Sequence, residues 1–147
     1  MIDLTLKKLD ASYARELSVL ENGCFSCPWS EEGFIDGLNN DRFYFIGLFE
    51  GDDLIGYGSL ATILDEGDIA RIAVRSDKRG MGCGKMIVCD LENEARSRGV
   101  VYLHLEVREG NAPARHLYEK VGFTSDGIRK NYYQKPLENA VLMTKKL

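Results

Sequence analysis

Residues 71–85 constrain the fold of this chain more than any other part of the sequence. They read Arg-Ile-Ala-Val-Arg-Ser-Asp-Lys-Arg-Gly-Met-Gly-Cys-Gly-Lys, so a short apolar strand at 72–74 enters a turn with glycines at 80, 82 and 84. A helical pattern begins directly after the turn. Glycines allow a backbone to approach a ligand closely, and a helix start offers free N–H donors and a positive dipole end. The stretch therefore predicts a strand–loop–helix unit that holds a pyrophosphate, with Lys78 and Arg79 beside it.

The spacing of the glycines excludes two common phosphate loops. A P-loop requires Gly-x-x-x-x-Gly-Lys-Ser/Thr, but Met86 stands where the hydroxyl is needed and Arg79 replaces the first glycine. A Rossmann loop requires Gly-x-Gly-x-x-Gly at the first strand of a βαβ unit, whereas this motif lies in mid-chain. The form present is Arg79-x-x-Gly82-x-Gly84. On the loop alone, a turn that only connects strand to helix remains the alternative.

Length and charge narrow the class of protein. A chain of 147 residues can bury the core of one domain, so we expect a single domain over 1–147. A net charge of -4 argues against a general nucleic-acid-binding surface. No apolar run is long enough to span a membrane, and the first residues lack the apolar core of a signal peptide. We therefore expect a cytoplasmic protein with neither nucleic acid nor membrane as a partner.

The cysteines do not form a recognisable metal site. Cys24 and Cys27 have Cys-x-x-Cys spacing but lack the second close pair that a zinc site uses. Cys83 and Cys89 are six residues apart on an expected helix, so they point to different faces. We expect no bound metal and reduced thiols that act as small apolar residues, with redox chemistry at the first pair as a minor alternative.

Hydrophobic periodicity divides the chain into strands and helices. Strands are expected at 2–8, 43–49, 54–64, 69–74, 100–108, 128–133 and 139–144. One helix is expected after Asp10, one after Ser30, one at 82–98 and one after Asn111, each of the three named residues being a good N-cap. The order is βααβββαβαββ, which predicts an α/β fold with a mixed sheet of about seven strands flanked by four helices.

The loop and the element order together resemble the GNAT superfamily of N-acetyltransferases over nearly the whole chain. The resemblance implies acetyl-CoA as co-substrate, with its pantetheine arm along 72–74, its pyrophosphate on the loop and the N–H of Val74 as oxyanion donor. The residues that it implies for binding acetyl-CoA are Ile72, Ala73, Val74, Arg79, Gly80, Met81, Gly82, Cys83, Gly84, Lys85 and Asn111.

Acetyl transfer to an amine needs a base for the amine and a donor for the oxyanion. Glu106 is the preferred base because it lies on the polar face of the alternating strand at 100–108. Its neighbours, Leu105-Glu106-Val107-Arg108, also resemble the superfamily segment at this place. From the pattern alone, a surface glutamate is an equal alternative. Glu66 ranks second because it lies in a turn signal beside Gly67.

Tyr118 is the expected acid for the departing thiolate. It lies on the apolar stripe of a short helix, where a core tyrosine would fit the pattern equally well. The segment Asn111-x-x-Ala114-x-x-Leu117-Tyr118-x-x-x-Gly122-Phe123 resembles the superfamily segment in which a tyrosine protonates the thiolate. The same resemblance implies that Asn111 contacts the CoA arm, in addition to capping its helix.

Two aromatic segments narrow the acceptor. The segments are Cys24-Phe25-x-x-Pro28-Trp29-Ser30 and Ile128-Arg129-x-Asn131-Tyr132-Tyr133, and they resemble the RimI-like ribosomal-protein-alanine N-acetyltransferases. This subfamily implies that the N-terminal alanine of a small-subunit ribosomal protein is the acceptor, in a groove walled by Trp29, Tyr132 and Tyr133. Ordinary aromatic packing is the alternative for each of the three.

An α-amine, with a pKa of about 7.7–8.0, needs less help to lose its proton than lysine at about 10.4. We therefore expect an enzyme whose partners are acetyl-CoA and the N-terminal peptide of a ribosomal protein, as a monomer or weak dimer. Acetylation of a lysine or a small-molecule amine remains open, as does a non-catalytic acyl-CoA-binding module. Residues 135–139 are expected to shape the entrance for the acceptor, and they do not indicate which acceptor sequence is preferred.

Overall fold

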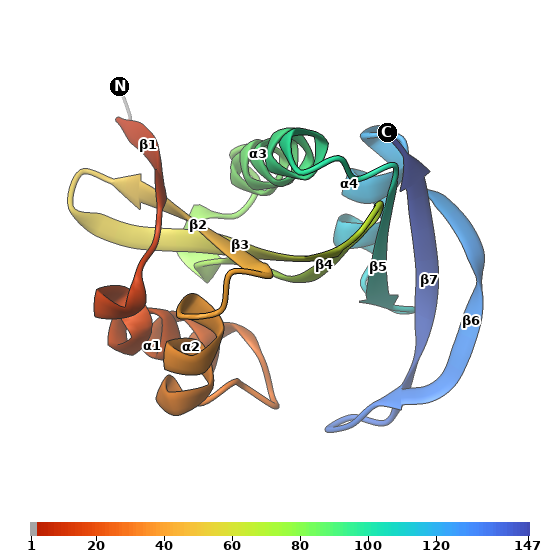
Figure 1. The fold of residues 1–147 in the computed structure, drawn as a ribbon. Coiled ribbons are helices and arrows are strands. Elements are labelled where there is room, and N and C mark those ends of the chain that lie inside the picture. Colours follow the sequence, from red (N-terminus) through yellow and green to blue (C-terminus); the bar gives the residue numbers. More distant parts are fainter. Residues whose placement is uncertain (1–2) are drawn as a thin grey trace.

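A computed structural model describes residues 3–147 as one seven-stranded sheet with helices on both faces (Figure 1). The strands are β1 (Leu4–Lys8), β2 (Phe43–Glu50), β3 (Asp53–Ile63), β4 (Glu66–Val74), β5 (Tyr102–Arg108), β6 (Thr124–Tyr133) and β7 (Glu138–Lys146). The helices are α1 (Ala14–Cys24), α2 (Glu31–Leu38), α3 (Cys83–Ser97) and α4 (Ala112–Lys120). The predicted α/β class and element order are confirmed; Ile2, the expected first strand residue, lies outside the described residues.

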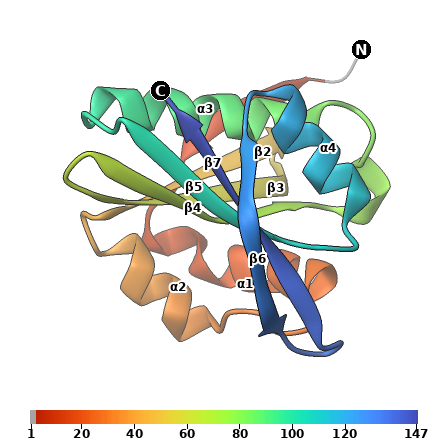
Figure 2. The ribbon, with the colours of Figure 1, turned by 90° about the vertical axis from the view of Figure 1, so that its right-hand side faces the viewer.

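The helices form two layers around the sheet. The strand order is β1-β2-β3-β4-β5-β7-β6, and every neighbouring pair is antiparallel except β4 and β5. α1 and α2 lie on one side of the sheet, and α3 and α4 lie on the other (Figure 2). A parallel pair requires a crossover, and here α3 supplies it between β4 and β5.

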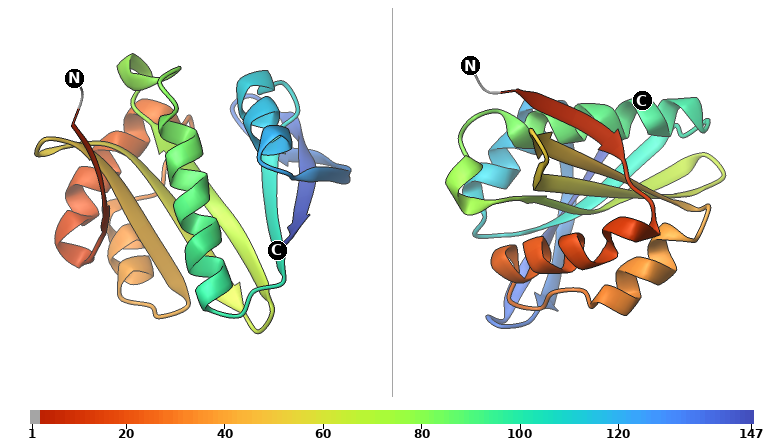
Figure 3. Two further views of the ribbon diagram at one scale, coloured as in Figure 1. Left: turned by 90° about the horizontal axis from the view of Figure 1, so that it is seen from above. Right: turned by 90° about the vertical axis from the view of Figure 1, so that its left-hand side faces the viewer.

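The parallel pair β4–β5 separates after a short paired stretch. Pairing runs only from Glu66 opposite Tyr102 to Ile69 opposite Leu105. Beyond it, β4 continues along β3 and β5 continues along β7, so the strands diverge like the arms of a V (Figure 3). The backbone edges of both strands therefore face an opening at their C-terminal ends, which is where ligands bind in parallel sheets.

The predicted N-caps are present, with one change of place. The Ser30 side chain accepts a hydrogen bond from Gly33 N, and that of Asn111 from Ala114 N. Asp10 caps a short 3₁₀ turn, Ala11–Tyr13, which precedes α1. Side-chain oxygens at these positions satisfy N–H groups that have no partner inside the helix.

β4 begins earlier than the expected start at residue 69. Glu66 pairs with Ile63 and Gly67 pairs with Thr62, so both residues belong to the strand and not to a turn. The turn is confined to Leu64 and Asp65. Cross-strand pairing with β3 therefore outweighs the local turn signal of the Asp-Glu-Gly sequence.

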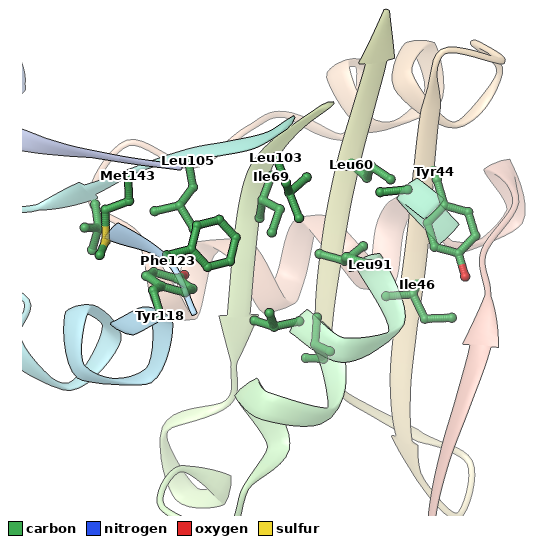
Figure 4. Packing of buried hydrophobic residues seen from close by; sticks show 14 of the residues in the cluster. Tyr44, Ile46, Leu60, Ile69, Leu91, Leu103, Leu105, Tyr118, Phe123 and Met143 are labelled. Carbon is green, nitrogen blue, oxygen red and sulfur yellow. The ribbon is translucent and has the colours of Figure 1, made fainter. Parts of the chain in front are cut away.

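Two hydrophobic clusters fill the two layers. The larger one lies between the sheet and α3 with α4, and it includes Leu91, Leu105, Tyr118 and Phe123 (Figure 4). The smaller one packs α1 and α2 on the opposite face around Phe34. Strand β5 follows its alternating sequence, with buried side chains at 103, 105 and 107 and half-buried polar ones at 104, 106 and 108.

Helix α3 approaches β3 closely because β3 carries a glycine beneath it. A Cβ atom at Gly58 would lie 2.4 Å from Ile87 Cγ2 and 3.0 Å from Leu91 Cδ1. We expect Gly58→Ala to lower the free energy of unfolding by about 1–3 kcal/mol, the usual cost of overpacking a core. Chemical denaturation measures the change. Gly23→Ala in α1 is the matched control, because no atom lies within 4 Å of the new methyl group; an equal loss there would contradict the explanation.

Candidate active site

One cavity of about 510 Å³ lies at the opening between β4 and α4. It is lined by all the residues expected to bind acetyl-CoA except Met81, and also by Tyr118. Five further residues line it that the sequence did not indicate for this role, namely Cys24, Phe25, Pro113, Ala114 and Leu117. The structure therefore brings the glycine loop, the end of β4 and α4 together around one space.

The glycine loop is shaped for close approach to an anion. Gly80 and Gly82 have φ values of +79° and +81°, which residues with a side chain rarely adopt. Gly82 is the N-cap of α3 and offers no side chain to the first N–H groups of the helix, and its carbonyl accepts from Met86 N at 3.1 Å. The N–H groups of the first turn of α3 are thus available to a ligand, and helix N-termini of this kind can bind phosphate.

Gly84 and Arg79 connect the glycine loop to its surroundings, Gly84 through contact with α4 and Arg79 through a hydrogen bond to β4. A Cβ atom at Gly84 would lie 3.0 Å from Leu117 Cδ2, so glycine permits α3 and α4 to meet here. The Arg79 side chain is exposed, and its Nε donates to the Val74 carbonyl at 3.0 Å. Lys85 is also exposed, so both expected cations lie at the surface beside the cavity.

The backbone of Val74 faces the opening. Arg75 N donates to the Ile55 carbonyl at 2.7 Å, which makes these two residues a hydrogen-bonded pair. Such pairs alternate in antiparallel sheets, so Val74 and its partner Gly56 form a pair without mutual hydrogen bonds. The N–H and C=O of Val74 therefore point away from β3, toward the cavity that Val74 lines.

Tyr118 is a core residue on one side and a cavity residue on the other. Its ring packs edge-on against Phe123 with 6.0 Å between centroids, and only 8% of its surface is exposed. Within residues 3–147 its hydroxyl makes no hydrogen bond to another side chain. Burial raises the pKa of Tyr118 to about 12, with a smaller contribution from the nearby Tyr133. The core position of Tyr118 is therefore observed, and the residue also lines the cavity, while its role as the acid stays a prediction.

Glu106 lies where the two strands separate. It is the first residue of β5 after Leu105, which is the last to pair with β4. Its side chain is half-buried on the face opposite α3. Its charge acts on Tyr133. Burial of that tyrosine and then the charge of Glu106 raise the pKa of Tyr133 to about 12.

The expected acceptor aromatics have different surroundings. Trp29 is half-buried and packs edge-on against Phe34 at 5.6 Å. Tyr133 is half-buried near Glu106, while Tyr132 is exposed under the Arg129 guanidinium, 5.2 Å from its ring centre. Trp29 and Tyr133 are thus partly buried, whereas Tyr132 is exposed and packs edge-on against Tyr133 with 5.0 Å between ring centroids.

A buried glutamate that the sequence analysis missed supports this side. Glu21 is fully buried in α1, and its carboxylate accepts from Tyr57 Oη at 2.6 Å and Trp29 N at 2.9 Å. Arg71 Nε also donates to it at 3.1 Å. The only sequence signal was a charged residue on the inner face of an apolar helix stripe, directly after Leu20 and four residues after Leu17.

A second cavity, about 500 Å³ in volume, lies between α1 and the turn that joins β2 to β3. It shares Cys24 with the first cavity but contains none of the predicted site residues. Size alone therefore does not identify the site; the glycine loop, the free edge of β4 and Tyr118 do. The part of the chain that the structure describes holds no group of three or more potential metal ligands. No helix among residues 3–147 is long and apolar enough to cross a membrane.

Comparisons with known proteins agree with this geometry. The acetyltransferase (GNAT) family model matches residues 14–123. The ribosomal protein bS18-alanine N-acetyltransferase of Haemophilus influenzae is 38% identical over 141 residues, which cover 94% of this chain and 95% of that protein. Its Salmonella typhimurium counterpart is 37% identical over 84% of each chain. The crystal structure of the Escherichia coli ribosomal-protein-S18-alanine N-acetyltransferase superposes with a TM-score of 0.90 at 31% identity, covering 98% of this chain and 94% of that one.

Proposed function

Because the chain belongs to the acetyltransferase (GNAT) family, we propose that it acetylates the N-terminal alanine of a small-subunit ribosomal protein. It is an acetyl-CoA-dependent N-acetyltransferase. The observation that carries the proposal is the separation of β4 from β5, with the glycine-loop cavity on one side and Glu106 with Tyr133 on the other. The choice of alanine and of a ribosomal protein rests on the activity named for the relatives.

The donor side fits coenzyme A. The N–H groups of the loop and of the first turn of α3 would hold the pyrophosphate, and Arg79 and Lys85 would add positive charge. The edge of β4 at 72–74 that faces away from β3 would pair with the amide-containing pantetheine arm as a missing strand would. At Val74 the N–H would make this contact, since its carbonyl already accepts from Arg79 Nε at 3.0 Å. Asn111 caps α4 from the cavity wall and can meet the same arm.

The proposed reaction is a direct attack. Glu106 takes a proton from the α-ammonium group, directly or through one water, and the free amine attacks the thioester carbonyl carbon. The negative charge that develops on the carbonyl oxygen meets the N–H of Val74. When the carbon–sulfur bond breaks, the Tyr118 hydroxyl donates its proton to the thiolate. The attacking nitrogen loses its second proton, which returns to the Tyr118 oxygen through solvent, and the proton on Glu106 leaves to solvent. The products are the acetylated amine and free coenzyme A.

The positions of the two candidate bases favour Glu106. Glu66 lies at the paired end of β4, about 26 Å along the strand from Val74 at about 3.3 Å per residue. Its side chain is exposed and contacts His104 Nε2 at 3.1 Å. Glu106 instead lies at the point where the opening begins. A base must be within hydrogen-bond reach of the amine or one water away, which supports Glu106.

The acceptor is tested with peptides that differ only in the position of the free amine. We expect acetyl-CoA and a peptide that begins with alanine to give a product blocked at its α-amine, measured by mass spectrometry and by thiol release. A peptide with a blocked N-terminus and an internal lysine is the matched comparison. Because an α-amine loses its proton more easily than a lysine, turnover of the lysine peptide should be far slower. Equal turnover of the two would contradict the proposal and favour the lysine alternative.

A further inference from the structure

Each of the diverging strands carries an arginine on the face that looks toward α1 and α2. Arg71 lies in β4 and Arg108 lies in β5, beyond the last paired residues of the two strands. Neither arginine is fully exposed, with side-chain exposures of 19% and 26%. Both donate to backbone carbonyls of loops that are distant in sequence, which is unusual for a solvated charge.

Arg71 holds the loop between α1 and α2. One of its nitrogens donates to the Cys27 carbonyl at 3.0 Å, and the guanidinium also pairs with Glu21 at 3.1 Å. The guanidinium lies 4.3 Å from the ring centre of Phe25 and 4.8 Å from that of Trp29. Because Glu21 is buried in α1, this arginine ties the loop to both the helix and β4.

Arg108 holds the loop between β6 and β7 in the same manner. It donates to the Gln134 carbonyl at 2.8 Å and to the Pro136 carbonyl at 2.9 Å. It also pairs with Glu138 at 3.1 Å and lies 4.6 Å from the ring centre of Tyr133. Glu138 in turn accepts from Gly110 N at 2.6 Å, so the contact anchors the loop to the end of β5.

The two loops meet across the opening. Both lie on the α1–α2 side of the sheet (Figure 1), and Cys27 Sγ is 4.0 Å from the Gln134 carbonyl oxygen that Arg108 also binds. The loops join side chains from both ends of the chain, Trp29 on one wall and Tyr133 on the other. Each arginine therefore fixes one of two loops that contact each other.

We propose that Arg71 and Arg108 are positioning residues that together hold the two walls of the acceptor groove at the spacing which the incoming peptide requires. The inference rests on the proposed function, because the acceptor groove is part of that proposal; the contacts of the two arginines with the two loops are observed independently of it. Arginine suits this role better than lysine because its planar fork donates in several fixed directions and stacks on aromatic rings. Neither residue exchanges a proton or contacts the thioester.

The test uses Arg71→Lys, Arg108→Lys and the double variant in the full-length enzyme. Lysine keeps the charge and loses the fork. We expect the KM for the alanine peptide to rise about tenfold in each single variant, as for the loss of one or two charge-assisted hydrogen bonds. The KM for acetyl-CoA should stay unchanged. Because both arginines set the spacing of the same two loops, the increase in KM in the double variant should be well below the product of the two single increases.

Hydrogen–deuterium exchange gives a readout that needs no acceptor. Residues 25–30 and 134–137 should exchange faster in the arginine variants, while the glycine loop stays as in the parent. Arg42→Gln is the matched control, because Arg42 is exposed and far from the groove in the fold. Glu138→Gln, a milder change to the Arg108 contact, serves if Arg108→Lys reduces the yield of folded protein.

Two outcomes would overturn the inference. Unchanged exchange in both loops would show that the arginines do not hold the walls, whichever amine is the acceptor. Equal increases in KM for peptide and acetyl-CoA would show a general loss of structure. If the parent enzyme does not acetylate the alanine peptide, the proposed acceptor is wrong, and the exchange measurements, which need no amine, still decide whether the arginines hold the two loops.

Discussion

Replacing Glu106 by glutamine should lower kcat/KM for the acceptor peptide by about 10²–10⁴-fold, the usual contribution of a general base. Glutamine has nearly the same shape but cannot accept the proton of the α-ammonium group. Binding of acetyl-CoA, measured by calorimetry, should stay nearly unchanged because Glu106 does not line the donor cavity. A large effect is expected because Glu106 lies at the point where β4 and β5 separate.

The pH dependence separates a base from a binding residue. An N-terminal amine has a pKa of about 7.7–8.0, so above this range it is free without help from the enzyme. The deficit of Glu106→Gln should therefore shrink as pH rises from neutrality. Glu119→Gln, at an exposed position of α4, is the matched control and should behave like the parent. A deficit that stays constant with pH would remove the role of base from Glu106.

Replacing Tyr118 by phenylalanine should lower kcat by about 10²-fold or more, toward the lower end of general-acid effects. A thiol has a pKa of about 8.5, so the thiolate leaves more easily than an amine would and needs less protonation. The ring stays in contact with Phe123, so the fold should be preserved. Tyr102→Phe, which removes an exposed hydroxyl from β5, is the matched control.

Burial makes Tyr118 suitable as a proton donor. Since burial raises its pKa from 10.0 to about 12, the hydroxyl keeps its proton throughout the neutral range. Because the pKa of Tyr118 is raised in the folded protein, its contribution favours the folded state below pH 10 and is lost as pH rises from 10 to about 12. Tyrosinate absorbance of the parent minus that of Tyr118→Phe should show a component that titrates near 12. Undiminished turnover in Tyr118→Phe would mean that another group protonates the thiolate.

The fold was predictable because most of its signals are local. The alternation at 100–108 and the capping residues Ser30 and Asn111 act within a few residues of themselves, and the structure follows them. The start of β4 was wrong by three residues, since pairing with β3 extends the strand through a sequence that is typical of a turn. Turn signals describe the chain alone, whereas strand ends depend on the partner strand.

The acceptor side was less predictable than the donor side. Glu21 and Arg71 are separated by fifty residues, so no spacing in the sequence connects them. Cys24 and Phe25 were not expected to line the cavity of the glycine loop, yet both do, because the end of α1 contacts the end of β4. Such relations arise only when helices and strands pack, and a single sequence carries no pattern for them.

Residues 71–85 by themselves determined the strand–loop–helix unit that we propose holds the donor, because a strand, positive-φ glycines and a helix start are properties of neighbouring residues. Only the tertiary structure decided how far β4 and β5 stay paired and which side chains lie where the two strands separate. It also decided that two loops distant in sequence meet at Cys27 and Gln134. The physical reason is that the opening is formed by strands that pair with different neighbours. Its width depends on the whole sheet and on the contacts that hold its walls.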